Sequence, residues 1–397
     1  MRKNKPPRRF GCWLVVFGAL FARSALAMPP PADRTRFSAE KIVGLGPLLR
    51  TTDLAVIESN PDGTMRQITL FAWAAAPPEL SHYVVGHPER YRDFARNMTV
   101  AELVHNPDGT VDQRYEFSYR ITTVDGINRF KLHKPEPGQP VGAIDHYDPV
   151  PGGTRWHRWE FIPYGGGSIL ALSGNVDLQH SGYPMDRLIK QVPTLEYGLA
   201  MIGQMTLLLT MKQRAEQLAR PVATPPITGN LESAYSFLLE KGIVVLMRRN
   251  QGKLGELSFI GETSLPKEKI YQRISQPESF SKTIASITKS KSLGLQDGVP
   301  VVEIEQSIPL ISFQTRFGVR SSEQTVDMMG FSGDLRGARF RWDLRNTTPQ
   351  RTQIVFRSLV AYDRSSLLIR QLYKLEPLFE YGINVGLNLV FIRGMMN

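Results

Sequence analysis

The chain has 397 residues, a length that suits two or three domains better than one. Its hydrophobic fraction of 42% is enough for packed cores and excludes a largely disordered protein. The formal net charge is +11, but residues 1–27 hold six basic side chains and no acidic one, so the remainder carries only +5. That excess is too small for a nucleic-acid-binding surface, and no nucleic acid is expected as a partner. Because Cys12 is the only cysteine, the chain after residue 27 has no disulfide, catalytic thiol or thiolate metal site.

The first 27 residues have the pattern of a secretory signal peptide. Residues 2–9 are strongly basic, residues 10–22 form an apolar run, and Ala25-Leu26-Ala27 matches the A-x-A cleavage signature. The apolar run is shorter than the roughly 20 residues that a membrane-spanning helix needs. We therefore expect cleavage after Ala27 and export to the periplasm or the medium, by either the Sec or the twin-arginine route.

The rest of the chain contains one unit twice. Four short blocks recur in the same order, at offsets of 183, 180, 184 and 189 residues. Offsets that drift this little are typical of a duplication whose loops have changed length. The matching blocks are 152–161 with 336–344, 188–191 with 368–371, 196–198 with 380–382, and 88–91 with 277–280.

The predicted elements follow one order in both halves. Each half begins with a strand, continues with two short helices that start near prolines and with a run of strands, and closes with a long helix. In the first half the predicted elements are a strand over 66–75, helices from Pro78 and Pro88, strands over 111–124, 127–133, 142–147, 154–162 and 168–178, and a helix over 184–217. In the second half they include a strand over 255–262, helices from Pro266 and Pro277, and a helix over 365–395. The predicted organisation is a signal peptide (1–27), an extension (28–50), domain 1 (51–218), a Pro/Gly-rich linker (219–231) and domain 2 (232–397).

This order of elements resembles the START-like superfamily, which includes polyketide cyclases and coenzyme Q-binding domains. The resemblance covers nearly all of residues 50–217 and 235–396. It implies an α+β fold of two tandem helix-grip domains, each a curved antiparallel sheet wrapped around a long C-terminal helix. It also implies an apolar cavity between each sheet and its helix.

The aromatic residues of one repeated strand are the first candidates for lining such a cavity. Because alternate residues of a strand face opposite sides, His157, Trp159 and Phe161 share one face, and the repeat places Phe340 and Trp342 on the same face of the second half. We expect this face to point inward, since exposing the rings would forgo about 25 cal/mol per Å² of burial. His157 is then either a donor or base in the cavity or a core imidazole bonded to a neighbour.

The closing helices supply the remaining candidates. Tyr197, Met201 and Met205 lie on one stripe of the first helix, which is either core or the lining of an adaptable cavity. In the second helix, Tyr381 and Asn384 are candidates for contact with a ligand. No G-x-S-x-G, P-loop, dinucleotide-binding or H-E-x-x-H pattern occurs, and we expect no metal and no cofactor.

Three functions remain compatible with these patterns. The first is an exported carrier for an apolar ligand such as a lipid, quinone, sterol or polyketide-like molecule. The second is a cyclase or aromatase that uses His157 or Tyr119 as acid or base, and the third is a structural tandem protein with a protein partner. Arg339, Arg341 and Arg345 form a basic outer surface that is either solvated or docks on an anionic membrane.

Overall fold

A computed structural model describes most of the chain. The described residues are 30–119, 122–149, 155–176, 189, 194–221, 231–250, 253–284, 286–308, 311–348, 350–359, 370 and 379–396. The predicted signal peptide, most of the predicted linker and the predicted beginnings of both closing helices lie outside them. Within the described residues, no helix combines the length and the apolar character needed to cross a membrane.

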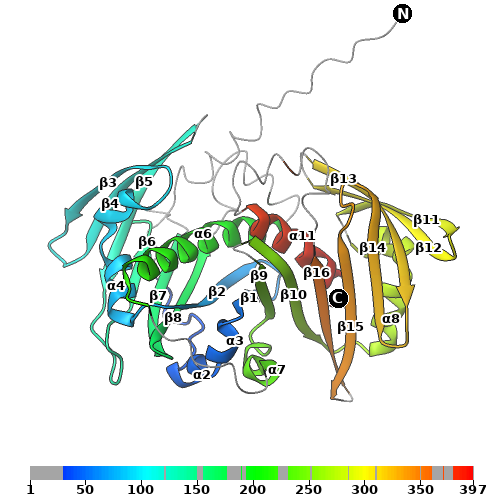
Figure 1. The fold of residues 1–397 in the computed structure, drawn as a ribbon, viewed down its shortest axis with the longest axis horizontal. Helices are drawn as coiled ribbons and strands as arrows, with labels where there is room; N and C mark the ends of the chain where they lie inside the picture. Colours follow the sequence, from blue (N-terminus) through cyan, green and yellow to red (C-terminus); the bar gives the residue numbers. More distant parts are fainter. Residues whose placement is uncertain are drawn as a thin grey trace, which may run out of the picture.

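The described strands form one antiparallel sheet that runs through both halves (Figure 1). It has 16 strands in the order β11-β12-β13-β14-β15-β16-β10-β9-β1-β2-β8-β7-β6-β5-β4-β3. From one edge to the centre the strands are β11 to β16, β10 and β9, and from the other edge they are β3 to β8, β2 and β1. The two halves therefore have the same strand order, which confirms the predicted duplication. The fold class is α+β, as expected, but the two sheets predicted from the sequence are joined into one.

The described elements of the two halves correspond in order, except that α9 has no counterpart in the first half. In the first half they are α2 (Ala39–Gly44), α3 (Gly46–Leu49), β1 (Thr52–Ser59), β2 (Met65–Ala74), α4 (Pro78–Gly86), η2 (Pro88–Asp93), β3 (Met98–His105), β4 (Val111–Tyr119), β5 (Thr122–Leu132), β6 (Ile144–Tyr147), β7 (Arg155–Tyr164), β8 (Gly167–Val176) and α6 (Thr194–Leu218). In the second half they are α7 (Leu231–Ala234), η3 (Ser236–Leu238), β9 (Ile243–Asn250), β10 (Lys253–Thr263), α8 (Lys267–Ser275), η4 (Pro277–Ser279), α9 (Phe280–Thr283), β11 (Ile287–Gln296), β12 (Val299–Ile308), β13 (Ile311–Ser321), β14 (Thr325–Gly333), β15 (Arg339–Thr348), β16 (Arg351–Leu359) and α11 (Phe379–Met396).

Several predicted boundaries were wrong. The residues expected to form a single strand over 111–124 instead belong to β4 and to the beginning of β5. These two strands pair side by side as an antiparallel hairpin. Strands β1, β3 and β9 were not predicted at all. The short helices at Pro78 and Pro88, and the turn between β7 and β8, are where the sequence placed them. Gly165 and Gly166 have positive φ angles in that turn, which explains why glycine occupies it.

The two halves join where β1 pairs with β9. Leu54 lies opposite Leu246, Ala55 opposite Val245, and the ladder continues on both sides of them. Strand β1 is buried along its length except for its last residue. A strand covered on both faces has no polar–apolar alternation, which is why its sequence carries no strand-like period.

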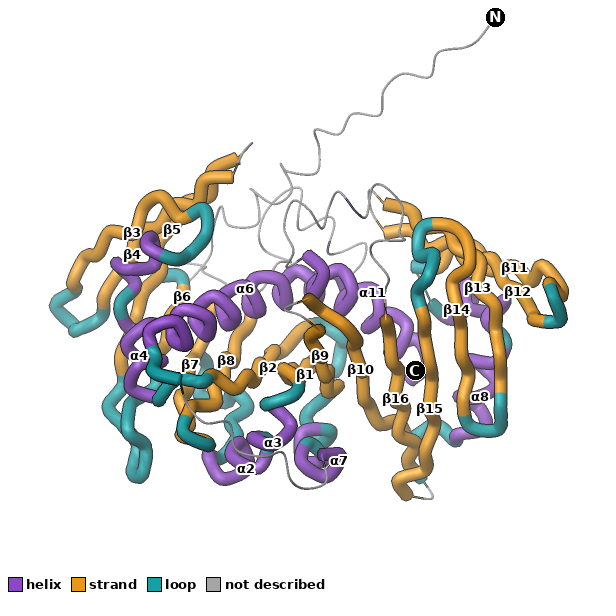
Figure 2. The backbone as a smooth tube through the Cα atoms, viewed as in Figure 1, coloured by secondary structure: helices purple, strands orange, loops and turns teal. Residues whose placement is uncertain are grey.

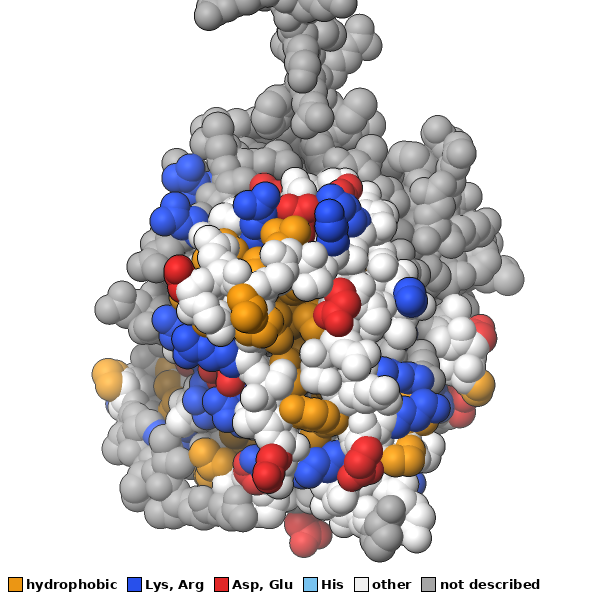
Figure 3. Space-filling model, turned by 90° about the vertical axis from the view of Figure 1, so that its right-hand side faces the viewer, with side chains coloured by type: hydrophobic (Ala, Val, Ile, Leu, Met, Phe, Trp, Pro, Cys, Tyr) orange, Lys and Arg blue, Asp and Glu red, His pale blue; other side chains and the backbone are white. Residues whose placement is uncertain are grey.

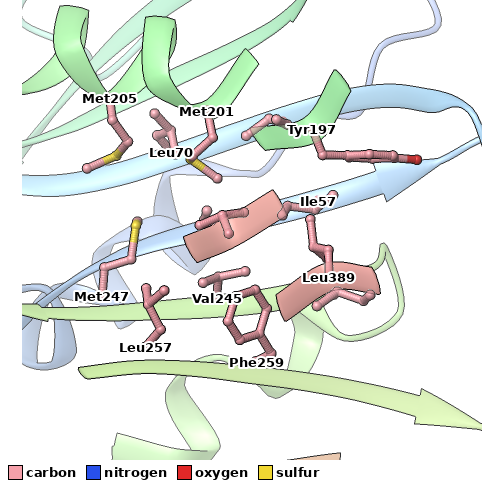
Figure 4. Packing of buried hydrophobic residues seen from close by; sticks show 14 of the residues in the cluster. Ile57, Leu70, Tyr197, Met201, Met205, Val245, Met247, Leu257, Phe259 and Leu389 are labelled. Atoms are coloured by element: carbon pink, nitrogen blue, oxygen red, sulfur yellow. The ribbon is translucent and has the colours of Figure 1, made fainter. Parts of the chain in front are cut away.

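Helices cover both faces of the sheet centre (Figure 2). On the inner face, Met201 and Met205 of α6 and Leu389 of α11 belong to one apolar cluster with residues of the central strands (Figure 4). On the outer face, α2, α3 and η3 cover a second apolar cluster that includes Ile42 and Leu238. The segment predicted as an extension is therefore part of the core.

The closing helices α6 and α11 pack against each other above the β1–β9 junction. A Cβ added to Gly386 would lie 3.4 Å from the Cα atom of Gly198, so the two backbones are close. Tyr197 of α6 donates from its hydroxyl to the carbonyl oxygen of Gly63 at 2.9 Å. The same hydroxyl oxygen accepts a hydrogen bond from Arg393 of α11 at 2.6 Å. The guanidinium also lies over the Tyr197 ring, 4.2 Å from its centroid, so this side chain links the halves.

We expect Tyr197→Phe to lower the free energy of unfolding by about 1–2 kcal/mol, because the half-buried carbonyl of Gly63 and guanidinium of Arg393 lose a hydrogen bond. Urea denaturation of the chain that starts at residue 28 measures the change. Tyr164→Phe is the control, since no hydrogen bond to its hydroxyl is found among the described residues. Equal stability of Tyr197→Phe and the control would contradict a linking role.

Candidate functional site

Strands β7 and β15 place the predicted aromatic residues on the inner face of the sheet. Trp159 and Phe161 of β7, and Phe340 and Trp342 of β15, are buried in the inner apolar cluster. The predicted alternation is therefore present in both halves. The opposite face differs between them, because Arg158 of β7 is buried whereas the corresponding Arg341 is exposed.

One transverse row of residues distinguishes the halves. In the first half, His146 of β6 lies opposite His157 of β7, which in turn lies opposite Gly174 of β8. The imidazole rings of the two histidines are 4.5 Å apart between centroids. In the second half the same row reads Met328, Phe340 and Ser358.

Each closing helix directs a carboxamide at this row. Gln204 lies eight residues after Glu196 in α6, and Asn388 lies eight residues after Glu380 in α11, so the repeat makes them equivalent. The Asn388 amide donates to the hydroxyl oxygen of Ser358 at 3.0 Å. In the first half this hydroxyl is replaced by the hydrogen of Gly174.

The glycine makes room for the polar side chains around it. A Cβ at Gly174 would lie 2.5 Å from Cδ2 of His157 and 3.2 Å from Nε2 of Gln204. Contacts of 2.5 Å are too short for carbon atoms, so residue 174 has to lack a side chain for His157 to lie where it does. We call His146, His157 and Gln204 the imidazole–amide cluster.

The imidazole–amide cluster contains buried polar atoms without partners. The exposed fraction is 5% for His146, 4% for His157 and 0% for Gln204. Within the described part of the chain, Nδ1 of both histidines and both amide atoms of Gln204 have no hydrogen-bonding partner. The same holds there for the indole nitrogen of Trp159. Unpaired buried polar atoms cost about 1–3 kcal/mol each, so a group of them at one place indicates an unusual role.

Burial keeps both imidazoles neutral. Desolvation lowers the pKa of His146 to about 3, and the nearby positive charge of Arg155 acts in the same direction. Desolvation also lowers the pKa of His157 well below its usual range, reinforced by His146 and Arg155. A neutral imidazole has one donor and one acceptor nitrogen, so it can bond to either a carbonyl or a hydroxyl group.

The second half contains a small cavity between the sheet and α11. Its volume is about 30 Å³, which is room for one water molecule. Asn384 and Asn388 line it, but both have hydrogen-bonding partners. The other lining residues are mainly apolar: Ile304, Gln306, Phe313, Thr315, Phe317, Leu335, Phe340, Leu387 and Phe391. This end of the molecule also shows hydrophobic side chains in a surface hollow with Lys and Arg around it (Figure 3).

The remaining predicted residues lie apart from these two places. Met201 and Met205 pack on the central strands near Ile57 and Leu70 (Figure 4). The hydroxyl of Tyr197 points toward the junction between the halves. The side chains of Tyr381 and Tyr119 lie outside the described residues.

The predicted basic surface of the second half is largely paired with acids. Arg341 forms an ion pair with Asp343 at 3.1 Å, and Arg345 forms one with Glu232 at 3.0 Å. Such exposed pairs contribute little to stability, but they partly neutralise the surface. No cluster of three or more His, Cys, Asp or Glu side chains that could hold a metal is found in the part of the chain that the structure describes.

Comparisons with known proteins give only distant structural resemblances. No family model and no curated protein matches the chain. The di-domain ARO/CYC StfQ from the steffimycin biosynthetic pathway is 12% identical over 81% of this chain and 96% of its own, with a TM-score of 0.28. The chain is also similar to a START superfamily protein from Mycobacterium smegmatis, with 18% identity over 34% of this chain and 94% of that protein and a TM-score of 0.27. A third similar structure is a STAR-related lipid transfer protein from Xanthomonas axonopodis, with 15% identity over 38% of this chain and 94% of that protein and a TM-score of 0.27. The element order of each half, with antiparallel strands, short helices after the second strand and a long closing helix, is the helix-grip order expected from the sequence.

The buried histidines predict a pH-dependent stability. An unfolded histidine takes up a proton near pH 6.5, whereas these two resist protonation when folded, so stability falls as the pH drops below about 6.5. We expect His146→Met/His157→Phe, which copies the second half, to reduce this loss by about 1 kcal/mol per histidine near pH 5.5. Urea denaturation at pH 7.5 and 5.5 measures it, with the exposed His105→Gln as control. Identical pH profiles for both variants would contradict the burial of neutral imidazoles.

The two carboxamides should respond oppositely to the same substitution. Gln204→Leu removes unpaired atoms and should leave the free energy of unfolding unchanged or raise it. Asn388→Leu breaks the bond to Ser358 and should lower it by about 1–3 kcal/mol. Urea denaturation of both variants tests this, and an equal loss in both would refute the assignment of Gln204 as unpaired.

Proposed function

We propose that the protein is an exported binding or transport protein that holds an apolar molecule between its sheet and a closing helix. The observation that carries this proposal is the second-half cavity, which lies between the sheet and α11 and is lined mainly by aromatic and aliphatic side chains. A lipid, quinone, sterol or polyketide-like compound has the chemistry that such a wall would bind. Export rests on the signal pattern that ends at Ala27.

The size of the cavity adds a requirement to the proposal. Ligand pockets usually measure about 300 Å³ or more, whereas this cavity measures about 30 Å³. Binding therefore requires α11 or the rings of Phe340 and Phe391 to move away from the sheet. None of the described residues that line the cavity carries a charge, so the movement would expose a mainly apolar surface that favours an uncharged ligand.

A cyclase or aromatase is the second candidate function. The observation in its favour is the neutral imidazole of His157, a potential base in the first half. Against it, no carboxylate among the described residues bonds to Nδ1 of His157 or His146 and so orients the ring for proton transfer. Docking on an anionic membrane through Arg339, Arg341 and Arg345 stays a prediction, and the ion pairs of Arg341 and Arg345 weaken it.

Native mass spectrometry of the chain from residue 28, purified from the exported fraction, should detect a bound apolar molecule that organic extraction releases. Leu387→Phe should reduce its occupancy at least about tenfold, because the larger ring fills the cavity. Leu359→Phe, at an exposed position of β16, is the matched control. A protein that stays free of ligand against a panel of lipids, quinones and sterols would refute the carrier proposal.

A further inference from the structure

The imidazole–amide cluster of the first half has buried polar atoms that packing alone does not explain. It brings together His146 and His157 from neighbouring strands and Gln204 from the closing helix, and all three are more than nine-tenths buried. Four of their polar atoms have no hydrogen-bonding partner among the residues that the structure describes. His157 lies where it does only because residue 174 is a glycine, and the Gln204 amide lies against the same glycine.

The second half shows that the fold does not require this arrangement. At the same positions it has Met328 and Phe340, which have no polar atoms to satisfy apart from the thioether sulfur. Its carboxamide, Asn388, is bonded to Ser358. One duplicated framework therefore holds a row with satisfied polar groups in one half and a buried row with unsatisfied polar atoms in the other.

The charges around the cluster define what it can bind. Arg155, on the same face of β7 as His157, forms an ion pair with Asp148 and a 2.8 Å hydrogen bond to Asn128. The cationic charge is therefore already balanced. The cluster itself is neutral and contains both donors and acceptors, which suits an uncharged oxygen and would leave a carboxylate without a counter-charge.

We propose that the imidazole–amide cluster binds the carbonyl or hydroxyl oxygen of an otherwise apolar ligand, so that the two halves have different sites. This inference rests on the proposed function and specifies its ligand class. The first half fixes the uncharged oxygen group between His157, His146 and Gln204, and Trp159 Nε1 is a further donor on the same face. The second half binds mainly by apolar contact.

The test compares two probes of the same shape, 1-naphthol and naphthalene, by equilibrium dialysis with the chain from residue 28. We expect 1-naphthol to bind about tenfold more tightly, because its hydroxyl satisfies buried partners that naphthalene leaves unpaired. Gln204→Leu and His146→Met/His157→Phe should abolish this preference and change naphthalene affinity less than about twofold. His105→Gln, an exposed substitution on β3, should keep the preference.

A second measurement reports on the site directly. In long-range ¹H–¹⁵N spectra, 1-naphthol should shift the ring nitrogens of two histidines, and these signals should be missing in His146→Met/His157→Phe. Equal affinity for both probes, or a preference that survives Gln204→Leu, overturns the inference. So does a crystal structure in which water alone bonds to the cluster and stays there when 1-naphthol is present.

The outcomes separate this inference from the proposed function. If both probes bind equally and Leu387→Phe weakens both, apolar binding stands and the polar site is refuted. If neither probe binds and no native ligand is found, both proposals fail.

Discussion

The pairing of β1 with β9 is the constraint on which the rest of the structure depends. It joins the two halves through their apolar central strands, so that the middle of the sheet must be covered on both faces. Helices α6 and α11 cover one face, and α2, α3 and η3 cover the other. The closing helices consequently meet, and a tyrosine of one, Tyr197, bonds to an arginine of the other, Arg393. Each closing helix is thus held by its own half and by its neighbour.

This shared centre leaves the outer strands of each half free to differ. The duplicated backbone keeps equivalent positions in register, so a substitution changes the chemistry at a fixed point. His157 and Phe340 occupy one such point, and Gly174 and Ser358 another. In both halves a carboxamide of the closing helix lies against this row: Gln204 in the first half and Asn388 in the second. The duplicated halves therefore share a backbone framework but differ in the side chains that point into the interior.

Local sequence patterns predicted much of the fold, but they could not predict which residues far apart in the chain come into contact. The repeat, the prolines that open the short helices and the inward face of Trp159 follow from spacing along the chain. Strands β1 and β9 lack alternation because both faces are buried, so periodicity could not identify them. The surroundings of His157 come from three separate elements. Only the shared spacing of Gln204 and Asn388 from the repeated Glu-Tyr-Gly could have indicated the carboxamide.

The energetics of the row argue against a purely structural reading of the first half. Buried polar atoms without partners cost about 1–3 kcal/mol each, a large fraction of the 5–15 kcal/mol that stabilises a typical domain. The second half shows, at Met328 and Phe340, apolar side chains that the same backbone accepts without that cost. Folding alone therefore does not account for His146, His157 and Gln204. A ligand oxygen atom bound between these three side chains would account for them. It would form hydrogen bonds with the unpaired donors and acceptors in a site from which bulk water is excluded.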